Sequence, residues 1–335
     1  MKFANIKEVA QKAGVSVSTV SRVINNSGYA SEEAKKRVID AVSQLNYNAN
    51  FFAKNLKTRT TRTVGLVITD ITNPFFSAIA RATEDLLSEY DYNLIICNTN
   101  ESPDKELRHF KMLYERRVDG ILLCGTGKNN DFVKKLIESG VIVILIDRYY
   151  EDLDLDVIKD DNIYGAKLLT EQLIAKGHTN IALIKGHINS RASVEREEGY
   201  LAALKKHGIE PSAEIIFNAG ATGETVQDIL DHIWEMNPRP TAILSLNASI
   251  AKKFIGILNT RNIRVPQDVA LASYGLEEFK TLYVPSITCI VQKPELYGEI
   301  AGNLMIERLL NEKNETNGAK KHILFAPDLF VGNSI

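Results

Sequence analysis

The sequence of 335 residues has few cysteines and no long apolar run. Its three cysteines, Cys97, Cys124 and Cys289, are far apart and lack the close pairing that zinc and redox sites require. No stretch approaches the roughly 18 apolar residues of a membrane span, and the charged N-terminal residues are unlike a signal peptide. We therefore expect a cytoplasmic protein with reduced thiols, no metal site and no membrane contact.

Sequence motifs typical of enzymes are also missing. The segment "GTGKNND", residues 125–131, begins like a dinucleotide-binding fingerprint but has Asn130 where the third glycine belongs. There is no phosphate loop, no G-x-S-x-G elbow and no pair of histidine ligands, and His178 fits a turn between a helix and a strand. We therefore expect no catalysis and no cofactor.

Positive charge is concentrated near the N-terminus. Residues 1–62 hold eleven Lys and Arg against four Asp and Glu, a net charge of +7. The remaining residues hold 29 against 38, a net charge of −9. A basic module joined to an acidic body is typical of a protein whose basic part meets the phosphates of DNA.

Residues 5–45 have the pattern of three short helices. Asn5 is expected to cap the first helix, Gly14 to end it with a positive φ, and Ser16 and Ser31 to cap the next two. Alone, a Ser/Thr-rich second helix would be equally typical of an ordinary surface helix. The spacing, the glycine turn and the local charge instead favour a helix-turn-helix, in which Arg22 could contact a guanine edge in the major groove.

The segments "IKEVAQKAGVSVSTVSRVIN" and "LNYNANFFAKNL" resemble the headpiece of the LacI family of bacterial transcriptional regulators, and the resemblance continues through the chain. It implies a nucleoid-associated regulator, in the simplest case a repressor, that binds a palindromic operator as a homodimer. It also implies a headpiece at 1–48 and a hinge at 49–61. The family pattern assigns DNA contacts to these positions: Asn5, Ser16, Val17, Ser18, Thr19, Ser21, Arg22, Asn25, Tyr29, Asn50, Ala53, Leu56 and Lys57.

In that family the hinge becomes helical on operator DNA, where a leucine opens a base step from the minor groove. The matching residue is Leu56, and the neighbouring Lys54, Lys57 and Arg59 suit a wedge flanked by phosphate contacts. Ala49 replaces the usual proline, so the hinge helix should be harder to order. The alternative is that Leu56 packs against the protein body.

Beyond Thr63, short apolar runs alternate with amphipathic helices, which predicts parallel sheets. The resemblance implies a periplasmic-binding-protein-like core of two doubly wound α/β lobes, with a ligand in the cleft between them. We expect the first lobe at 62–160 plus 292–322 and the second at 161–291 plus 323–335. A periplasmic sugar-binding protein, the rival class, would have a signal peptide and no use for a basic headpiece.

By match to the family, ten residues are expected around the effector. Phe75 and Phe76 would cover an apolar sugar face, and Arg148 follows Asp147 at the end of a strand. Asp161 and Gln292 could instead only brace the junction between the lobes. The full set is Asp70, Asn73, Phe75, Phe76, Arg148, Asp161, Arg196, Asn247, Gly275 and Gln292.

Two departures indicate the class of effector. Ala248 and Gly275 stand where many members carry hydroxyl-binding aspartates, whereas Arg148 and Arg196 remain. Because arginine suits carboxylates and phosphates, this favours a sugar acid of the gluconate or keto-deoxygluconate type, with a sugar phosphate second. A neutral sugar remains the alternative if Glu277 or Glu278 turns into the pocket.

The sequence says little about three further properties: the direction of the switch, a protein corepressor and tetramer formation. The sequence does not give the sign of the switch by which an effector would alter the lobe angle and the order of the hinge. A phosphoprotein corepressor on the first lobe is possible. No heptad pattern follows the core, so no tetramer is expected.

Overall fold

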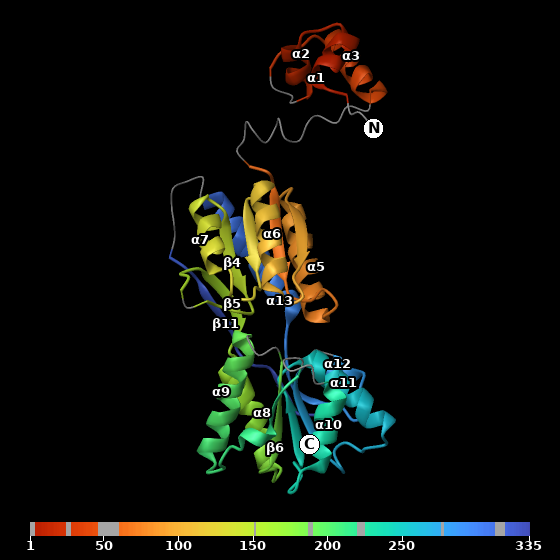
Figure 1. Ribbon diagram of the computed structural model, residues 1–335. Helices are drawn as coiled ribbons and strands as arrows, with labels where there is room; N and C mark the ends of the chain where they lie inside the picture. Colours follow the sequence, from red (N-terminus) through yellow and green to blue (C-terminus); the bar gives the residue numbers. More distant parts are fainter. Residues whose placement is uncertain are drawn as a thin grey trace. The chain divides into compact units, whose positions relative to one another are not determined.

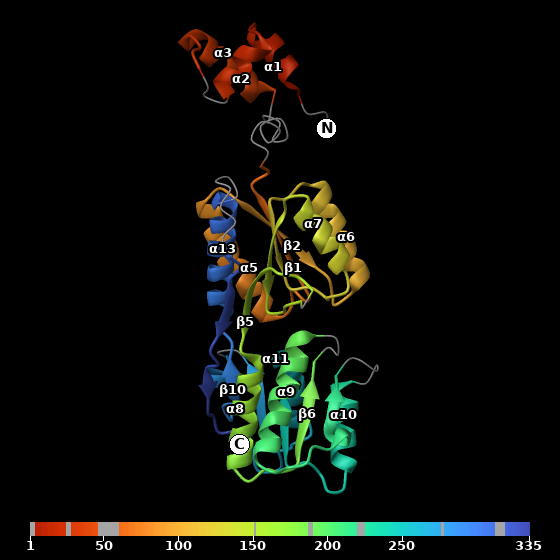
Figure 2. The ribbon, with the colours of Figure 1, turned by 90° about the vertical axis from the view of Figure 1, so that its left-hand side faces the viewer.

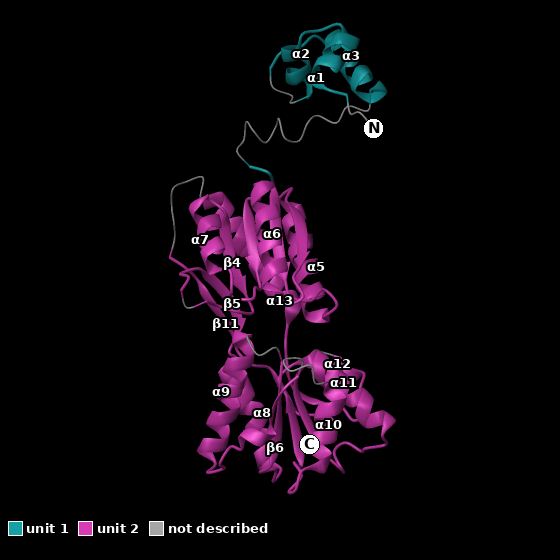
Figure 3. Cartoon of the chain, in the orientation of Figure 1, with its two compact units in different colours: residues 1–61 teal, residues 62–335 magenta. Residues whose placement is uncertain are grey.

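The computed structural model describes residues 4–24, 28–45, 60–150, 152–186, 190–219, 225–275, 278–311 and 319–335. The chain divides into two compact units, residues 1–61 and residues 62–335 (Figure 3). Each unit has its own hydrophobic core. The predicted fold class, a helical headpiece and a two-lobed α/β core, is confirmed.

The first unit contains three helices, α1 (Ile6–Ala13), α2 (Val17–Ile24) and α3 (Glu32–Gln44). The expected local signals are present, because Asn5 and Glu8 form a capping box on α1 and Gly14 ends that helix at φ 64°. Val9, Val20 and Val38, one from each helix, are fully buried in a shared core. The amphipathic pattern therefore explains how so short a segment folds.

The first lobe of the second unit has a sheet in the order β11-β5-β4-β3-β1-β2 (Figure 1). Its strands are β1 (Thr63–Ile68), β2 (Asn93–Asn98), β3 (Gly120–Leu123), β4 (Ile142–Ile146), β5 (Asp156–Asp160) and β11 (His322–Phe325). Its helices are α5 (Pro74–Glu89), α6 (Pro103–Glu115), α7 (Asn130–Glu138) and α13 (Pro294–Asn311).

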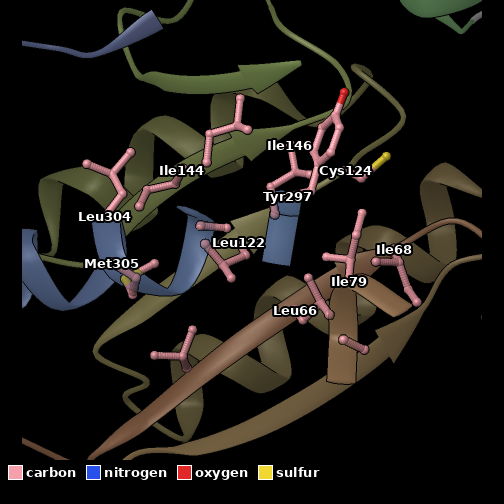
Figure 4. Close-up of a cluster of buried hydrophobic side chains, with 14 of the residues drawn as sticks. Leu66, Ile68, Ile79, Leu122, Cys124, Ile144, Ile146, Tyr297, Leu304 and Met305 are labelled. Atoms are coloured by element: carbon pink, nitrogen blue, oxygen red, sulfur yellow. The ribbon is translucent and has the colours of Figure 1, made fainter. Parts of the chain in front are cut away.

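Alternate residues of these strands are buried on opposite faces. Leu66 and Ile68 pack against α5 and α13, in the cluster of Figure 4. Val67, between them, packs with the side chains of α6 and α7. Figure 2 shows the two helix pairs on opposite sides of the sheet. Strands buried on both faces explain the continuous apolar runs of the sequence.

The second lobe has a sheet in the order β12-β10-β9-β8-β6-β7. Its strands are β6 (Ile181–Lys185), β7 (Ile216–Asn218), β8 (Ala242–Ser245), β9 (Ala270–Gly275), β10 (Thr288–Val291) and β12 (Leu329–Phe330). Its helices are α8 (Asn162–Ala175), α9 (Arg191–Lys206), α10 (Val226–Glu235), α11 (Ala248–Thr260) and α12 (Glu278–Thr281), with a short 3-10 turn at Ala213–Ile215. Helices α8 and α9 cover one face, and α10 to α12 cover the other.

The chain passes between the lobes three times, and the last passage differs from the sequence prediction. We expected residues 323–335 to lie in the second lobe. Instead β11 pairs in parallel with β5, and only β12 joins the second sheet, antiparallel to β10. The backbone N–H of Lys321 donates to Asp156 at 2.7 Å, which aligns this segment with the first-lobe edge. The crossing therefore lies between Phe325 and Leu329.

Candidate DNA-reading helix and effector cavity

Helix α2 has one buried side and one exposed side. Val20 is fully buried, whereas Val17 is 41% exposed and Ser18 and Arg22 are exposed. Ser16 caps the helix, because its hydroxyl accepts from the Thr19 N–H at 3.1 Å. The exposed side thus combines small side chains with one long cation, as a helix that enters the major groove requires.

The other predicted DNA contacts have different surroundings. Thr19 and Ser21 are half-buried, Tyr29 is 89% exposed, and the carboxamide oxygen of Asn5 is used by the α1 cap. Several predicted positions lie outside the described residues: Asn25, Asn50, Ala53, Leu56 and Lys57. The DNA contacts of all these residues remain predictions.

A cavity of about 370 Å³ lies between the two lobes, at the carboxyl ends of strands from both sheets. This is where parallel α/β sheets usually bind ligands. Most of the residues expected around an effector line it: Asp70, Asn73, Phe75, Phe76, Arg148, Arg196, Asn247 and Gln292. The topology therefore brings together residues more than 200 positions apart in the sequence.

Asp161 and Gly275 are not among the lining residues. Asp161 caps α8, accepting from the Tyr164 N–H at 3.0 Å. Gly275 ends β9, and a Cβ there would collide with the Phe279 ring and lie 3.1 Å from the Cβ of Cys289. The glycine is thus explained by packing, a cause that the sequence did not indicate.

Arg148 is buried and already has a carboxylate partner. Its Nη1 and Nη2 donate to the two oxygens of Glu101 at 2.9 and 2.5 Å, and Nη1 also donates to the Gly125 carbonyl at 3.1 Å. Glu101 also lines the cavity and was missed, because it follows a strand 47 residues before Arg148. The positive charge of Arg148 is therefore largely neutralised within the first lobe.

Arg196 has neutral partners. Its Nε donates to Asn162 at 2.8 Å and its Nη1 to the Leu246 carbonyl at 2.7 Å, while its guanidinium carbon lies 3.7 Å from the Tyr274 ring centroid. These contacts fix the orientation of the guanidinium. Burial raises the pKa of the nearby carboxyls of Asp147 and Asp160, and the charge of the guanidinium opposes this rise. Lys253, another cavity residue that was missed, adds a second positive charge from α11.

The two walls of the cavity consequently differ in charge. Among the described lining residues, the first lobe contributes Asp70, Glu101 and Asp147 with Arg148, whereas the second contributes Arg196 and Lys253 and no acid. Burial raises the pKa of Asp147, an effect that Arg196 and Arg148 oppose. A ligand between the walls would therefore meet acceptors on one side and cations on the other.

Two further side chains of the lining have distinct roles. Gln292 donates from Nε2 to Asp160 at 2.9 Å, so it ties the second crossing to the end of β5 as well as lining the cavity. The hydroxyl of Ser193, which the sequence analysis missed, is buried without a hydrogen-bond partner in the described part of the chain. Such a group is a candidate ligand contact.

Two family models match the chain. Residues 61–326 match the periplasmic binding proteins and sugar binding domain of the LacI family, and residues 5–50 match bacterial regulatory proteins of the lacI family. The chain belongs to the LacI family. The predicted family membership is thus confirmed, whereas the sugar-acid subtype is not tested by these matches.

Relatives of this LacI-family chain are named as repressors. The HTH-type transcriptional repressor PurR of Actinobacillus pleuropneumoniae serotype 3 (strain JL03) is 32% identical over 333 residues, covering 99% of this chain and 98% of the relative. PurR of Vibrio atlanticus (strain LGP32) is 34% identical, with 96% of each chain covered. The LacI-family chain is accordingly a DNA-binding transcriptional repressor whose core binds a small-molecule effector.

Solved structures have the same architecture. The transcriptional regulator CelR in complex with cellobiose is 27% identical, with a TM-score of 0.70 and 99% of each chain covered. The lac repressor bound to ONPG in the repressed state has a TM-score of 0.78 at 22% identity, with both chains fully covered. The second likeness concerns the fold alone. In the described part of this LacI-family chain, no helix is long and apolar enough to cross a membrane.

Proposed function

We propose that this repressor responds to a hydroxyl-rich carboxylate, a sugar acid, bound between its lobes. The supporting observation is the charge difference between the two cavity walls. Asp70 and Glu101 would accept hydrogen bonds from hydroxyl groups, and Arg196 and Lys253 would bind the carboxylate. Charge-assisted hydrogen bonds of this kind are about twice as strong as neutral ones.

The alternative of a neutral sugar depended on Glu277 or Glu278. Glu278 forms an ion pair with Lys252 and is not among the described cavity residues, and Glu277 lies outside the described residues. No described residue of the second wall carries a carboxylate, so a neutral sugar would give Arg196 and Lys253 no anionic group to bind. The CelR complex with cellobiose nevertheless makes neutral sugars a necessary comparison.

A phosphoprotein corepressor is not favoured on the outer face of α5 and α13. In the described part of the chain, the groove between these helices is lined by four acids, Asp85, Glu89, Glu295 and Glu299, and by one arginine, Arg81. A phosphate-bearing partner would meet like charges there. We therefore propose small-molecule control without a phosphoprotein at this groove.

We also propose that the protein acts as a homodimer through its second lobe. Leu282 is 75% exposed and Val284 is 98% exposed, beside a groove of about 640 Å³ that α11 helps to form. Exposed apolar patches of this kind mark protein interfaces. A second copy is the fitting partner because a palindromic operator requires two headpieces.

Thermal unfolding with a ligand panel tests the effector class, because a ligand that binds only the folded state raises the midpoint. The panel contains gluconate, keto-deoxygluconate, glucose, cellobiose, a hexose phosphate and purine bases. We expect sugar acids to raise the midpoint of the wild type and to lose this effect in Lys253→Gln and Arg196→Gln. Lys205→Gln, which removes an exposed charge from the far end of α9, is the matched control.

The outcomes separate the alternatives. A shift with a neutral sugar or a purine base that survives in both variants would overturn the carboxylate proposal. Lys253 is exposed, so Lys253→Gln should fold even if the buried Arg196→Gln does not. Operator binding by the wild type, measured with and without the active ligand, then gives the sign of the switch.

A further inference from the structure

A second, smaller cavity of about 280 Å³ lies beside the effector cavity. Among the described residues, its lining has the cations Lys128 and Arg191, the Arg148 side chain that Glu101 neutralises, and one acid, Asp152. Arg148 lines both cavities, whereas Lys128 and Arg191 line the smaller cavity and not the effector cavity. We name this space the Lys128 chamber.

One wall of the Lys128 chamber is the loop from Gly125 to Lys128, which lies in the "GTGKNND" segment of the sequence. Gly127 has φ 72°, and a Cβ there would lie 2.9 Å from the ring of Tyr150. The buried carboxylate of Glu106 holds the loop from beneath, accepting from the Thr126 N–H at 2.6 Å and its hydroxyl at 2.8 Å. This wall is therefore fixed, and its glycines allow Tyr150 to pack closely.

Two buried polar atoms of residues that line the chamber make no hydrogen bond of normal geometry among the described residues. One is the Nε of Arg148, which lies 3.9 Å from Oδ2 of Asp147, and the other is the hydroxyl of Tyr150, which lies beside the Gly127 backbone. Both residues line the chamber. Because a buried donor without a well-formed hydrogen bond is costly, these two atoms beside the cations Lys128 and Arg191 favour a ligand that accepts hydrogen bonds.

The chamber also joins the two lobes. Lys128, Tyr149 and Tyr150 belong to first-lobe loops, whereas Arg191 is the first residue of α9 in the second lobe. Arg191 donates from Nη2 to the Tyr149 hydroxyl at 2.8 Å, and its guanidinium carbon lies 5.2 Å from that ring centroid. This contact holds a second-lobe cation at a first-lobe wall.

We propose that the Lys128 chamber binds a phosphate group. Lys128 and Arg191 supply the charge, and Arg148 Nε and the Tyr150 hydroxyl donate hydrogen bonds to the phosphate oxygens. A phosphate between Lys128 and Arg191 offsets the repulsion of two cations from opposite lobes, so its binding favours this interlobe arrangement. The phosphate is either free inorganic phosphate or part of an effector whose sugar body occupies the neighbouring cavity.

Isothermal titration of the full-length protein with inorganic phosphate, at constant ionic strength in chloride buffer, tests the chamber itself. We expect saturable binding that weakens about tenfold or more in Lys128→Gln and in Tyr150→Phe, because each loses a charged or hydrogen-bonding contact. Lys134→Gln, which removes an exposed charge from α7, should bind as the wild type does. This probe does not depend on the sugar-acid proposal.

Tyr150→Phe separates ligand binding from a structural role. Removing a buried hydroxyl without a well-formed hydrogen bond should leave the thermal midpoint of the free protein unchanged or raise it, while phosphate binding weakens. The source of the phosphate follows from comparing gluconate with 6-phosphogluconate. An affinity gain of at least tenfold for the phosphorylated compound, lost in Lys128→Gln, supports an attached phosphate.

If 6-phosphogluconate gains nothing over gluconate but inorganic phosphate binds and requires Lys128, the chamber takes free phosphate. Absence of saturable binding by the wild type for both phosphate probes would overturn the proposal. Equal affinities in the wild type, Lys128→Gln and Tyr150→Phe would do the same.

Discussion

Arg308 of α13 and Asp156 of β5 form a buried ion pair with two hydrogen bonds, of 2.9 and 2.7 Å. The two side chains are 8% and 2% exposed. The hydrogen bonds that Arg308 donates to Asp156 raise the pKa of the guanidinium. The pair fixes α13 against the strand where the chain leaves the first lobe.

Removing one partner of this pair should be costly. We expect Arg308→Leu to lower the free energy of unfolding by about 3 to 5 kcal/mol, because the buried Asp156 carboxylate loses its cationic partner and keeps the hydrogen bond from the Lys321 N–H. Urea denaturation measures the loss. Lys321→Gln, which removes only an exposed ion pair with Glu307, should cost less than about 1 kcal/mol. Equal, small losses in both variants would contradict a structural role for the buried pair.

Arg22 should discriminate between DNA sequences. We expect Arg22→Ala to lose about 1 to 3 kcal/mol of binding free energy on the cognate operator and little on random DNA, because a guanine contact carries sequence information. Fluorescence anisotropy at fixed salt measures the binding free energy on the cognate operator and on random DNA. Lys12→Ala, in the last turn of α1, serves as a charge-matched comparison. Equal losses of Arg22→Ala on the two DNAs would make Arg22 a phosphate contact.

The two positions that lack the family's aspartates should respond differently to restoring them. Ala248 lines the cavity, so Ala248→Asp is expected to weaken sugar-acid binding at least tenfold, because a carboxylate enters the cationic wall. Gly275→Asp should instead destabilise the fold by about 1 to 3 kcal/mol through overpacking against Phe279. Ligand titration and thermal unfolding of both variants measure the two effects. A stable Gly275→Asp protein would refute the packing explanation.

The Arg264–Asp268 pair gives a pH prediction. Hydrogen bonds from Arg264 lower the pKa of Asp268 to about 2. A carboxyl whose pKa is lower in the folded than in the unfolded state contributes stability above its unfolded pKa of about 4 and loses it as pH falls toward 2. NMR titration of the Asp268 carboxyl should give the low value. In Arg264→Gln the pKa of Asp268 should return toward its ordinary value. An unchanged pKa would mean that the Arg264 side chain does not cause the low value.

Local features were predictable from sequence, and distant pairings were not. Asn5, Gly14 and Ser16 act within a few residues, so their capping roles follow from the sequence alone. Strand β5 carries Asp156, Lys159 and Asp160, charges that hide its strand pattern and that are explained only by distant partners such as Arg308.

The effector cavity illustrates the same limit. Family spacing identified Arg148 and Arg196 but could not say that Glu101 neutralises the first and that the second has neutral partners. Lys253 lies on an exposed helix position, where a lysine is ordinary, so nothing in the sequence distinguished it. The charge difference between the walls therefore emerged only from the assembled structure.

Asn73 and Asn247 line the effector cavity and also begin helices α5 and α11, accepting from the N–H groups of Phe75 at 3.1 Å and Ser249 at 2.9 Å. A descendant protein that adapts to another effector can exchange either asparagine only for another capping residue, such as Asp, Ser or Thr, without weakening the start of a helix. Substitutions that change effector specificity should thus occur at positions such as Ala248 and Lys253, whose side chains do not cap a helix.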